Sequence, residues 1–166
     1  RGLESLVARH GLPYKVEVAI SADFERIVGQ FKRAALIIGI HGAGLSGMFF
    51  AAQCTTVIEV MWRDLVFANP TAFAAHAIAL GHDYWTVFGN ASEPDFGGLS
   101  TGVPMSNARL DGLILQTLRE KQAAMRTGGN SALLDYCLEK SQVDRNRTYL
   151  AENNSSNVSR STFSLQ

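Results

Sequence analysis

Residues 36–47 read LIIGIHGAGLSG, and this stretch decides the fold of the 166-residue chain. Its first five residues form a continuously apolar run, which is typical of a parallel strand with both faces covered. Gly42, Gly44 and Gly47 then match the pattern G-x-G-x-x-G, where a strand is expected to turn into a helix. Glycine lets a backbone approach a diphosphate closely, and the N–H groups of a helix start favour negative charge. The stretch therefore predicts a strand, a phosphate-binding turn and a helix.

Strands and helices alternate on both sides of this stretch. Alternation without hairpin signals predicts an α/β fold, a mostly parallel sheet of about four strands with flanking helices. The further strands are expected at residues 14–20, 55–61 and 84–88, and the helices at residues 21–35, through Phe49 and Phe50 to Ala52, at 71–80 and from Ser106 to about Thr127.

The chain divides by composition into a compact part and a tail. Residues 1–127 are expected to form one Rossmann-like, nucleotide-binding unit. Residues 128–166 are rich in Ser, Asn and charged side chains, which predicts a mostly disordered tail with a weak helical patch at 132–138. The first residue is Arg1, and the predicted strands are fewer than a complete doubly wound domain usually has. We therefore expect further sequence before Arg1.

The charge balance argues against a nucleic-acid partner. Fifteen Lys and Arg residues face 15 Asp and Glu residues, so the chain has no excess of positive charge to neutralise phosphates.

The apolar runs are shorter than the roughly 20 residues that span a bilayer. Cys54 and Cys137 are too few for a disulfide scaffold and lack the spacing of a zinc site, so no metal is expected, and whether they pair remains open.

Glu59 is the one charge within the predicted strand at residues 55–61. In dinucleotide-binding folds, an acidic residue about 20 positions after the glycine fingerprint binds the ribose, and Glu59 follows Gly42 somewhat sooner. That fingerprint normally lies on the first strand, whereas here another predicted strand precedes it. An FAD- or NAD-binding oxidoreductase domain nevertheless remains an alternative function.

A hydrolase is a weaker alternative. Residues 41–44 (HGAG) can be read as an oxyanion loop and residues 98–102 (GLSTG) as a nucleophile elbow. The elbow requires a strand before the serine and a helix after it, and neither pattern surrounds Ser100. All four histidines also precede Ser100, whereas the triad order places the histidine last. The residues therefore argue against a hydrolase.

An ordered set of segments resembles glycosyltransferase family 61. It consists of IIGIHGAGLS at residues 37–46, two phenylalanines at 49–50 and VIEV at 57–60. An upstream segment at residues 24–35 and Tyr84, after the acidic strand, extend the resemblance over about residues 14–88. Gly47 and the alanines at 51–52 depart from the usual family pattern, which affects the fine shape of the loop.

The resemblance implies the C-terminal, donor-binding half of an inverting, GT-B-type transferase, whose N-terminal, acceptor-binding domain would lie before Arg1. Such enzymes move a sugar of the xylose, arabinose or N-acetylglucosamine class from a UDP-sugar to a glycan or glycoprotein acceptor, here without a metal or a tightly bound cofactor. By resemblance, His41 contacts the diphosphate or the transferred sugar, and Glu59 accepts hydrogen bonds from the ribose. The expected phosphate cradle is Gly42, Ala43, Gly44, Leu45 and Ser46.

The resemblance also bears on compartment and completeness. It implies a Golgi or endoplasmic reticulum lumenal enzyme, attached to a membrane only through an N-terminal anchor outside this chain. A bacterial cytoplasmic enzyme and a non-enzymatic nucleotide-sugar-binding module are the alternatives. The catalytic base is not identified, and in a two-domain transferase it can come from the N-terminal half, so this chain alone is expected to be inactive. The aromatic side chains near the loop are expected in the core rather than stacked on uracil: Phe49, Phe50, Phe67 and Phe73.

Overall fold

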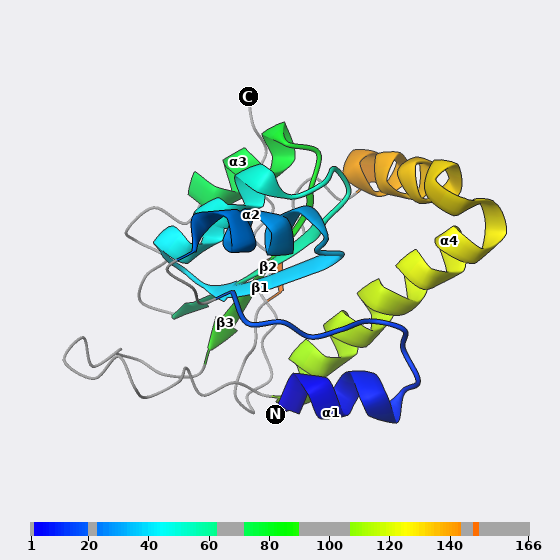
Figure 1. Ribbon diagram of the computed structural model, residues 1–166, viewed down its shortest axis with the longest axis horizontal. Helices are drawn as coiled ribbons and strands as arrows, with labels where there is room; N and C mark the ends of the chain where they lie inside the picture. The colour runs from blue at the N-terminus through cyan, green and yellow to red at the C-terminus, as the bar shows by residue number, and fades with distance from the viewer. Residues whose placement is uncertain (1, 20–22, 63–71, 90–106, 144–147, 150–166) are drawn as a thin grey trace.

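The structure is a computed structural model, and it describes residues 2–19, 23–62, 72–89, 107–143 and 148–149. A parallel sheet of strand order β1-β2-β3-β4 forms its centre (Figure 1), and β4 has only two residues. The expected α/β fold with a parallel sheet and flanking helices is confirmed. The strands are β1 (Leu36–Ile40), β2 (Thr56–Trp62), β3 (Asp83–Gly89) and β4 (Thr148–Tyr149), and the helices are α1 (Gly2–Arg9), α2 (Phe24–Lys32), the 3-10 helix η1 (Ala43–Phe50), α3 (Ala72–Ala79) and α4 (Asn107–Val143).

The register of β2 assigns its side chains to two layers. Ile58 lies opposite Ile38 of β1 and Trp85 of β3, and Val57 lies opposite Ile37 and Tyr84. Successive side chains of a strand point to opposite faces, so Ile58 and Val57 belong to different layers. Both are fully buried, as expected for a central parallel strand covered on each face.

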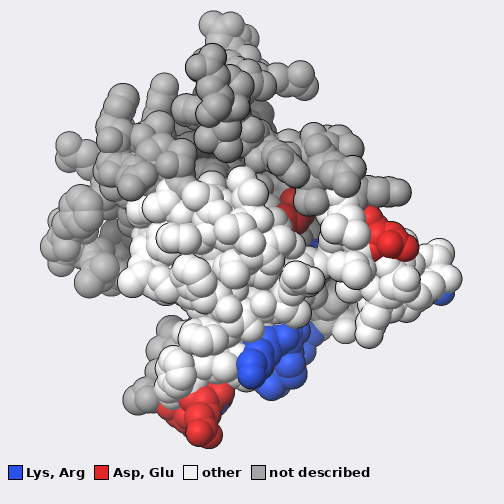
Figure 2. Space-filling view, turned by 90° about the horizontal axis from the view of Figure 1, so that it is seen from above, with Lys and Arg blue, Asp and Glu red and all other residues white. Residues whose placement is uncertain are grey.

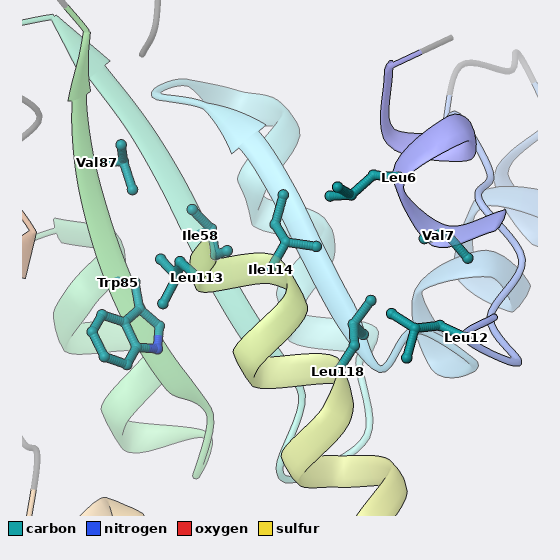
Figure 3. Close-up of a cluster of buried hydrophobic side chains, with 9 residues drawn as sticks. All are labelled: Leu6, Val7, Leu12, Ile58, Trp85, Val87, Leu113, Ile114 and Leu118. Carbon is teal, nitrogen blue, oxygen red and sulfur yellow. The ribbon is translucent and has the colours of Figure 1, made fainter. Parts of the chain in front are cut away.

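On the first face, α1 and α4 cover the sheet. Figure 3 shows α4 laying its apolar side chains across β2 and β3, with α1 on the far side of the helix. Trp85 is 2% exposed, and burying an aromatic side chain of this kind stabilises a fold by about 1.5–3 kcal/mol. The cluster consists of Leu6, Val7, Leu12, Ile58, Trp85, Val87, Leu113, Ile114 and Leu118.

On the second face, α2, η1 and α3 cover the sheet (Figure 1). α2 begins at Asp23, whose side chain accepts a hydrogen bond from the backbone N–H of Arg26 and so satisfies one of the free donors of the helix start. This second cluster carries the glycine loop described below, and its buried members are Phe31, Ile37, Leu45, Met48, Val57 and Ala77.

The strand expected at residues 14–20 is wrong for residues 14–19, which form no regular secondary structure. The alternation behind that prediction is real, because Tyr14 and Val16 pack against the first cluster while Lys15 and Glu17 pair outside it at 2.8 Å. The Tyr14 hydroxyl donates to the carbonyl of Leu118 at 3.2 Å. The segment thus buries its apolar side chains against the first cluster, which includes side chains of α4, and residues 14–19 pair with no described strand.

Helix α4 continues beyond the end that the sequence predicts. Its backbone departs from helical geometry at Gly128 and at Gly129, where φ is +61°, and then resumes to Val143. Residues 128–143, expected to be mostly disordered, are therefore part of this kinked helix. Cys137 of its second half forms a disulfide with Cys54, which answers the open question of their pairing.

The described surface carries few charges on the side seen in Figure 2. One small group of basic side chains lies there near acidic ones, amid a mostly uncharged surface. Among the residues that the structure describes, no helix has the length and apolar character to cross a bilayer.

Candidate functional site

The glycine loop, residues 41–46, begins where β1 ends. The backbone N–H of His41 donates to the carbonyl of Val60 at 2.8 Å, which ties the chain to β2 one residue past the strand. Gly42 then adopts φ 151° and ψ 179°, a region that glycine alone occupies readily. The N–H of Leu45 donates to the carbonyl of Gly42 at 3.0 Å and starts η1. The loop therefore places a helix start at the carboxyl end of a parallel strand, as the sequence predicts.

The three glycines of the fingerprint have different structural roles. Gly42 supplies the backbone conformation, as described above. Gly47 lies so close to the ring of Phe31 that a Cβ at this position would overlap with it. A Cβ at Gly44, in contrast, would have no atom within 4 Å. Gly44 is thus the glycine that the described fold does not require, and its missing side chain leaves the loop open on its outer side.

The other residues of the loop divide between the core and the solvent. Leu45 is 1% exposed and packs onto Gly39 of β1, where a Cβ would come within 2.7 Å of the leucine side chain. Ala43, Gly44 and Ser46 are exposed. Leu45 therefore anchors the loop with its side chain and can offer only its backbone to a ligand.

The start of η1 presents backbone donors to solvent. In a 3-10 helix, the N–H groups of the first two residues have no hydrogen-bond acceptor within the helix. In η1 these are the N–H groups of Ala43 and Gly44, because the N–H of Leu45 is the first that bonds. Both residues are exposed, and the start of a helix carries partial positive charge. This arrangement suits an anionic group such as a phosphate.

Beside the loop, the side chains of His41 and Glu59 form a hydrogen-bonded pair. His41 Nδ1 and Glu59 Oε1 are 2.5 Å apart, and the side chains are 24% and 1% exposed, respectively. Glu59 comes from the middle of β2, opposite Gly39 of β1. The imidazole is therefore the part of this pair that a ligand can reach.

Tyr84 of β3 completes the network. Its hydroxyl donates to Glu59 Oε2, so each oxygen of the buried carboxyl faces a protein partner. Tyr84 lies opposite Val57, which is two residues from Glu59 and on the same face of the sheet. Burial raises the pKa of Glu59, and the hydrogen bond and charge of His41 oppose that shift.

This geometry bears on the role predicted for Glu59. The sequence assigns its carboxylate to ribose hydroxyls, but the structure buries both oxygens against His41 and Tyr84. A ribose would have to displace one of these partners to reach the carboxylate. His41 and the outer side of the glycine loop remain accessible, whereas Glu59 is buried and hydrogen-bonded to His41.

The aromatic side chains do not all lie in the core. Phe49 and Phe50 are 49% and 39% exposed, so the core expectation is wrong for both. Phe73 packs against the second cluster, with its ring centroid 5.5 Å from that of His41. Phe67 lies outside the described residues, as does Ser100 of the rejected hydrolase motif.

Tyr84 is the network member to which sequence analysis assigns no role. A carboxyl group buried within a strand needs hydrogen-bond donors, and the neighbouring strand is the natural source. The sequence therefore indicates that a neighbouring strand supplies a hydrogen-bond donor to Glu59. It does not by itself select Tyr84, because the choice depends on the register of β2 and β3.

The described residues bring together no group of three or more His, Cys, Asp or Glu side chains that could hold a metal ion.

Comparisons of the chain with models of protein families, with curated proteins and with solved structures found no match in any of the three. A functional conclusion therefore depends on the glycine loop and the His41 network themselves.

Proposed function

We propose that this chain is the Rossmann-like, nucleotide-sugar-binding half of an inverting GT-B-type glycosyltransferase. It would transfer a sugar of the xylose, arabinose or N-acetylglucosamine class from a UDP-sugar to a glycan or glycoprotein acceptor. The observation that carries the proposal is the exposed glycine loop at the end of β1, next to an imidazole held by a buried carboxyl group.

The diphosphate is the part of the donor that the loop suits best. Gly42 makes the turn, and Ala43 and Gly44 offer backbone N–H groups at the start of η1. Ser46, also exposed, adds a hydroxyl that can donate to a phosphate oxygen. As the sugar leaves the diphosphate, negative charge grows on the phosphate oxygens, and fixed donors of this kind stabilise it. No metal is needed for this contribution.

The environment of Glu59 argues against the ribose-binding role that the dinucleotide-binding alternative needs and that the resemblance also gave to this residue. An NAD- or FAD-binding fingerprint needs an acidic side chain that reaches the ribose. The carboxyl of Glu59 is 1% exposed and bonded by His41 and Tyr84. In the transferase proposal, Glu59 no longer contacts the ribose but supports His41 beside the donor.

The disulfide supports the proposed compartment. Disulfides persist in the secretory pathway and are rare in the cytosol, so the bond between Cys54 and Cys137 agrees with a Golgi or endoplasmic reticulum lumenal enzyme. The acceptor glycan would bind mainly to the partner domain of the two-domain enzyme.

The test is calorimetric titration of the chain with UDP, with NAD and FAD as competing candidates. Gly44→Val is the informative variant, because no described atom lies within 4 Å of a Cβ at Gly44 and the new side chain projects toward the ligand. Gly112→Val is the matched control. Its position is equally open but lies on α4, next to side chains that cover the opposite face of the sheet.

The expected result is saturable UDP binding that weakens at least about tenfold in Gly44→Val, which corresponds to about 1.4 kcal/mol, and is unchanged in Gly112→Val. NAD or FAD binding that depends on Gly44 would instead establish the dinucleotide alternative. If UDP binds equally well to the chain and to Gly44→Val, the glycine loop is not the diphosphate site.

A further inference from the structure

The structure distinguishes between the two ligand contacts that the sequence leaves open for His41, the diphosphate and the transferred sugar. The distinction depends on which ring nitrogen carries the proton. In a neutral imidazole one nitrogen donates and the other accepts, and the partner of one nitrogen fixes the role of the other. For His41, that partner is Glu59.

Tyr84 restricts how Glu59 can bond. A tyrosine hydroxyl facing a carboxylate acts as the donor, so Oε2 of Glu59 accepts from Tyr84. The other oxygen, Oε1, lies 2.5 Å from Nδ1 of His41. The carboxyl is shielded from water, so a hydrogen-bond donor on each oxygen is what stabilises it there. Both oxygens have a donor when Nδ1 of His41 carries a proton and donates a hydrogen bond to Oε1.

We propose that Tyr84 and Glu59 are positioning residues that hold His41 as the Nδ1–H tautomer, so that Nε2 accepts a hydrogen bond from a hydroxyl of the transferred sugar. The assignment of the ligand to a sugar rests on the proposed function. A lone pair at Nε2 attracts a hydroxyl proton and repels an unprotonated phosphate oxygen. The backbone N–H groups of Ala43 and Gly44 therefore bind the diphosphate, and His41 accepts a hydrogen bond from the sugar next to it.

The packing around the imidazole agrees with a fixed orientation. The ring of His41 meets the ring of Phe73 edge to face, with centroids 5.5 Å apart and an interplanar angle of 77°. Phe73 comes from α3, whereas Glu59 and Tyr84 come from β2 and β3. Glu59 and Phe73 therefore contact the ring from two different elements, and Tyr84 in turn holds Glu59. These contacts limit rotation of the ring, which is what a positioned acceptor requires.

The first test measures the tautomer by nitrogen NMR of the histidine rings, in the free 166-residue chain at pH 8. His82 supplies an internal reference, because its Nε2 lies 3.0 Å from the carbonyl oxygen of Met48 and must donate to it. The expected spectrum contains His41 protonated on Nδ1 and His82 protonated on Nε2. A His41 ring protonated on Nε2, or on both nitrogens, overturns the proposal.

Two conservative variants test the positioning residues. Glu59→Gln retains the shape of the side chain and removes the carboxylate, and Tyr84→Phe removes only the hydroxyl. In each variant, the Nδ1–H signal of His41 should weaken in favour of the Nε2–H form, while His82 keeps its signal and reports that the chain remains folded. An unchanged His41 spectrum in Tyr84→Phe would exclude Tyr84 from this role.

A binding experiment separates this inference from the proposed function. Titrations use UDP alone and then UDP-xylose, UDP-arabinose and UDP-N-acetylglucosamine. Loss of one hydrogen bond in Glu59→Gln or Tyr84→Phe should weaken one of the UDP-sugars by about three- to tenfold and leave UDP unchanged. If UDP weakens equally, His41 contacts the diphosphate and the inference fails. If the chain binds no UDP compound, the proposed function fails, while the tautomer measurement still stands by itself.

Discussion

Cys54 and Cys137 are joined by a disulfide across 83 residues of sequence, with their Cα atoms 5.5 Å apart. Cys54 lies just before β2 in a left-handed backbone conformation, φ 74°, and the buried side chain of Lys121 donates to its carbonyl. Cys137 lies in the part of α4 that follows the kink at Gly128 and Gly129. The bond therefore fastens the second half of the helix to the segment just before β2, a central strand of the sheet.

Removing this disulfide is expected to destabilise the chain. The bond closes a long loop and lowers the entropy of the unfolded state, so Cys137→Ser should reduce the free energy of unfolding by about 4 kcal/mol. Urea denaturation with and without dithiothreitol measures the effect. Reductant should shift the unmodified chain to the midpoint of the variant and leave the variant itself unchanged. If the unmodified chain unfolds at the same urea midpoint with and without dithiothreitol, the prediction is contradicted.

The main features of the fold could be predicted from local sequence patterns. The apolar run at β1 and the β-branched run at β2 indicated buried parallel strands, and both were confirmed. The strand expected at residues 14–20 failed because alternating side chains also suit an extended segment packed on a helix, as Tyr14 and Val16 do on the first cluster. The helix at residues 130–143 was underestimated, and its bond to Cys54 is a contact across 83 residues that no local pattern reveals.

The candidate site was predictable in position and less so in detail. The order of strand, glycines and helix placed the loop correctly, since each of these features is local. The burial of Glu59 and its contact with Tyr84 depend on the register between neighbouring strands, which no local pattern encodes. The role of a polar residue in a strand therefore changes once its neighbours are known.

Gly47 is predicted to be required for packing rather than for ligand binding. A Cβ at this position would overlap with the ring of Phe31, which is buried in the second cluster. Gly47→Ala should therefore lower the free energy of unfolding by about 1–3 kcal/mol, as overpacked core variants do. Thermal or urea denaturation provides the measurement.

Gly112→Ala is the matched control for that variant. Gly112 is exposed in α4, and no described atom lies within 4 Å of a Cβ there. Alanine favours the helix over glycine, so this variant should gain about 0.5–1 kcal/mol. Similar losses in both variants would show that glycine-to-alanine changes destabilise the chain in general, and the Phe31 contact would then not be the cause.

Gly42 is predicted to be required for its backbone conformation. With φ at 151° and ψ at 179°, it occupies a region in which a side chain costs about 1–3 kcal/mol. Gly42→Ala should lose that amount of stability or distort the loop, although a Cβ there meets no neighbouring atom. Gly44→Ala should change stability by less than about 0.5 kcal/mol. Urea denaturation of the two variants distinguishes conformational strain from steric overlap, and equal stabilities would exclude strain at Gly42.

His82 is predicted to make the fold sensitive to acid. Its side chain is 4% exposed, and burial lowers the pKa of its imidazole below the ordinary value of 6.5, with the charge of Lys121 acting in the same direction. The unfolded chain then binds a proton more readily than the folded chain between these two pKa values. Stability is therefore full above pH 6.5 and falls as the pH drops below it, by at most about 1.4 kcal/mol per pH unit.

His82→Gln isolates this effect, because its amide can still donate to the carbonyl of Met48 but does not titrate. Urea denaturation of both proteins at pH 8, 7, 6 and 5.5 should show a stability difference that is constant above pH 6.5 and moves against the unmodified chain below it. Glu59 acts in the opposite direction, since its raised pKa lowers stability as the pH rises above 4.5, but it is present in both proteins and cancels in the difference. Parallel pH profiles would mean that the burial of His82 does not account for acid sensitivity.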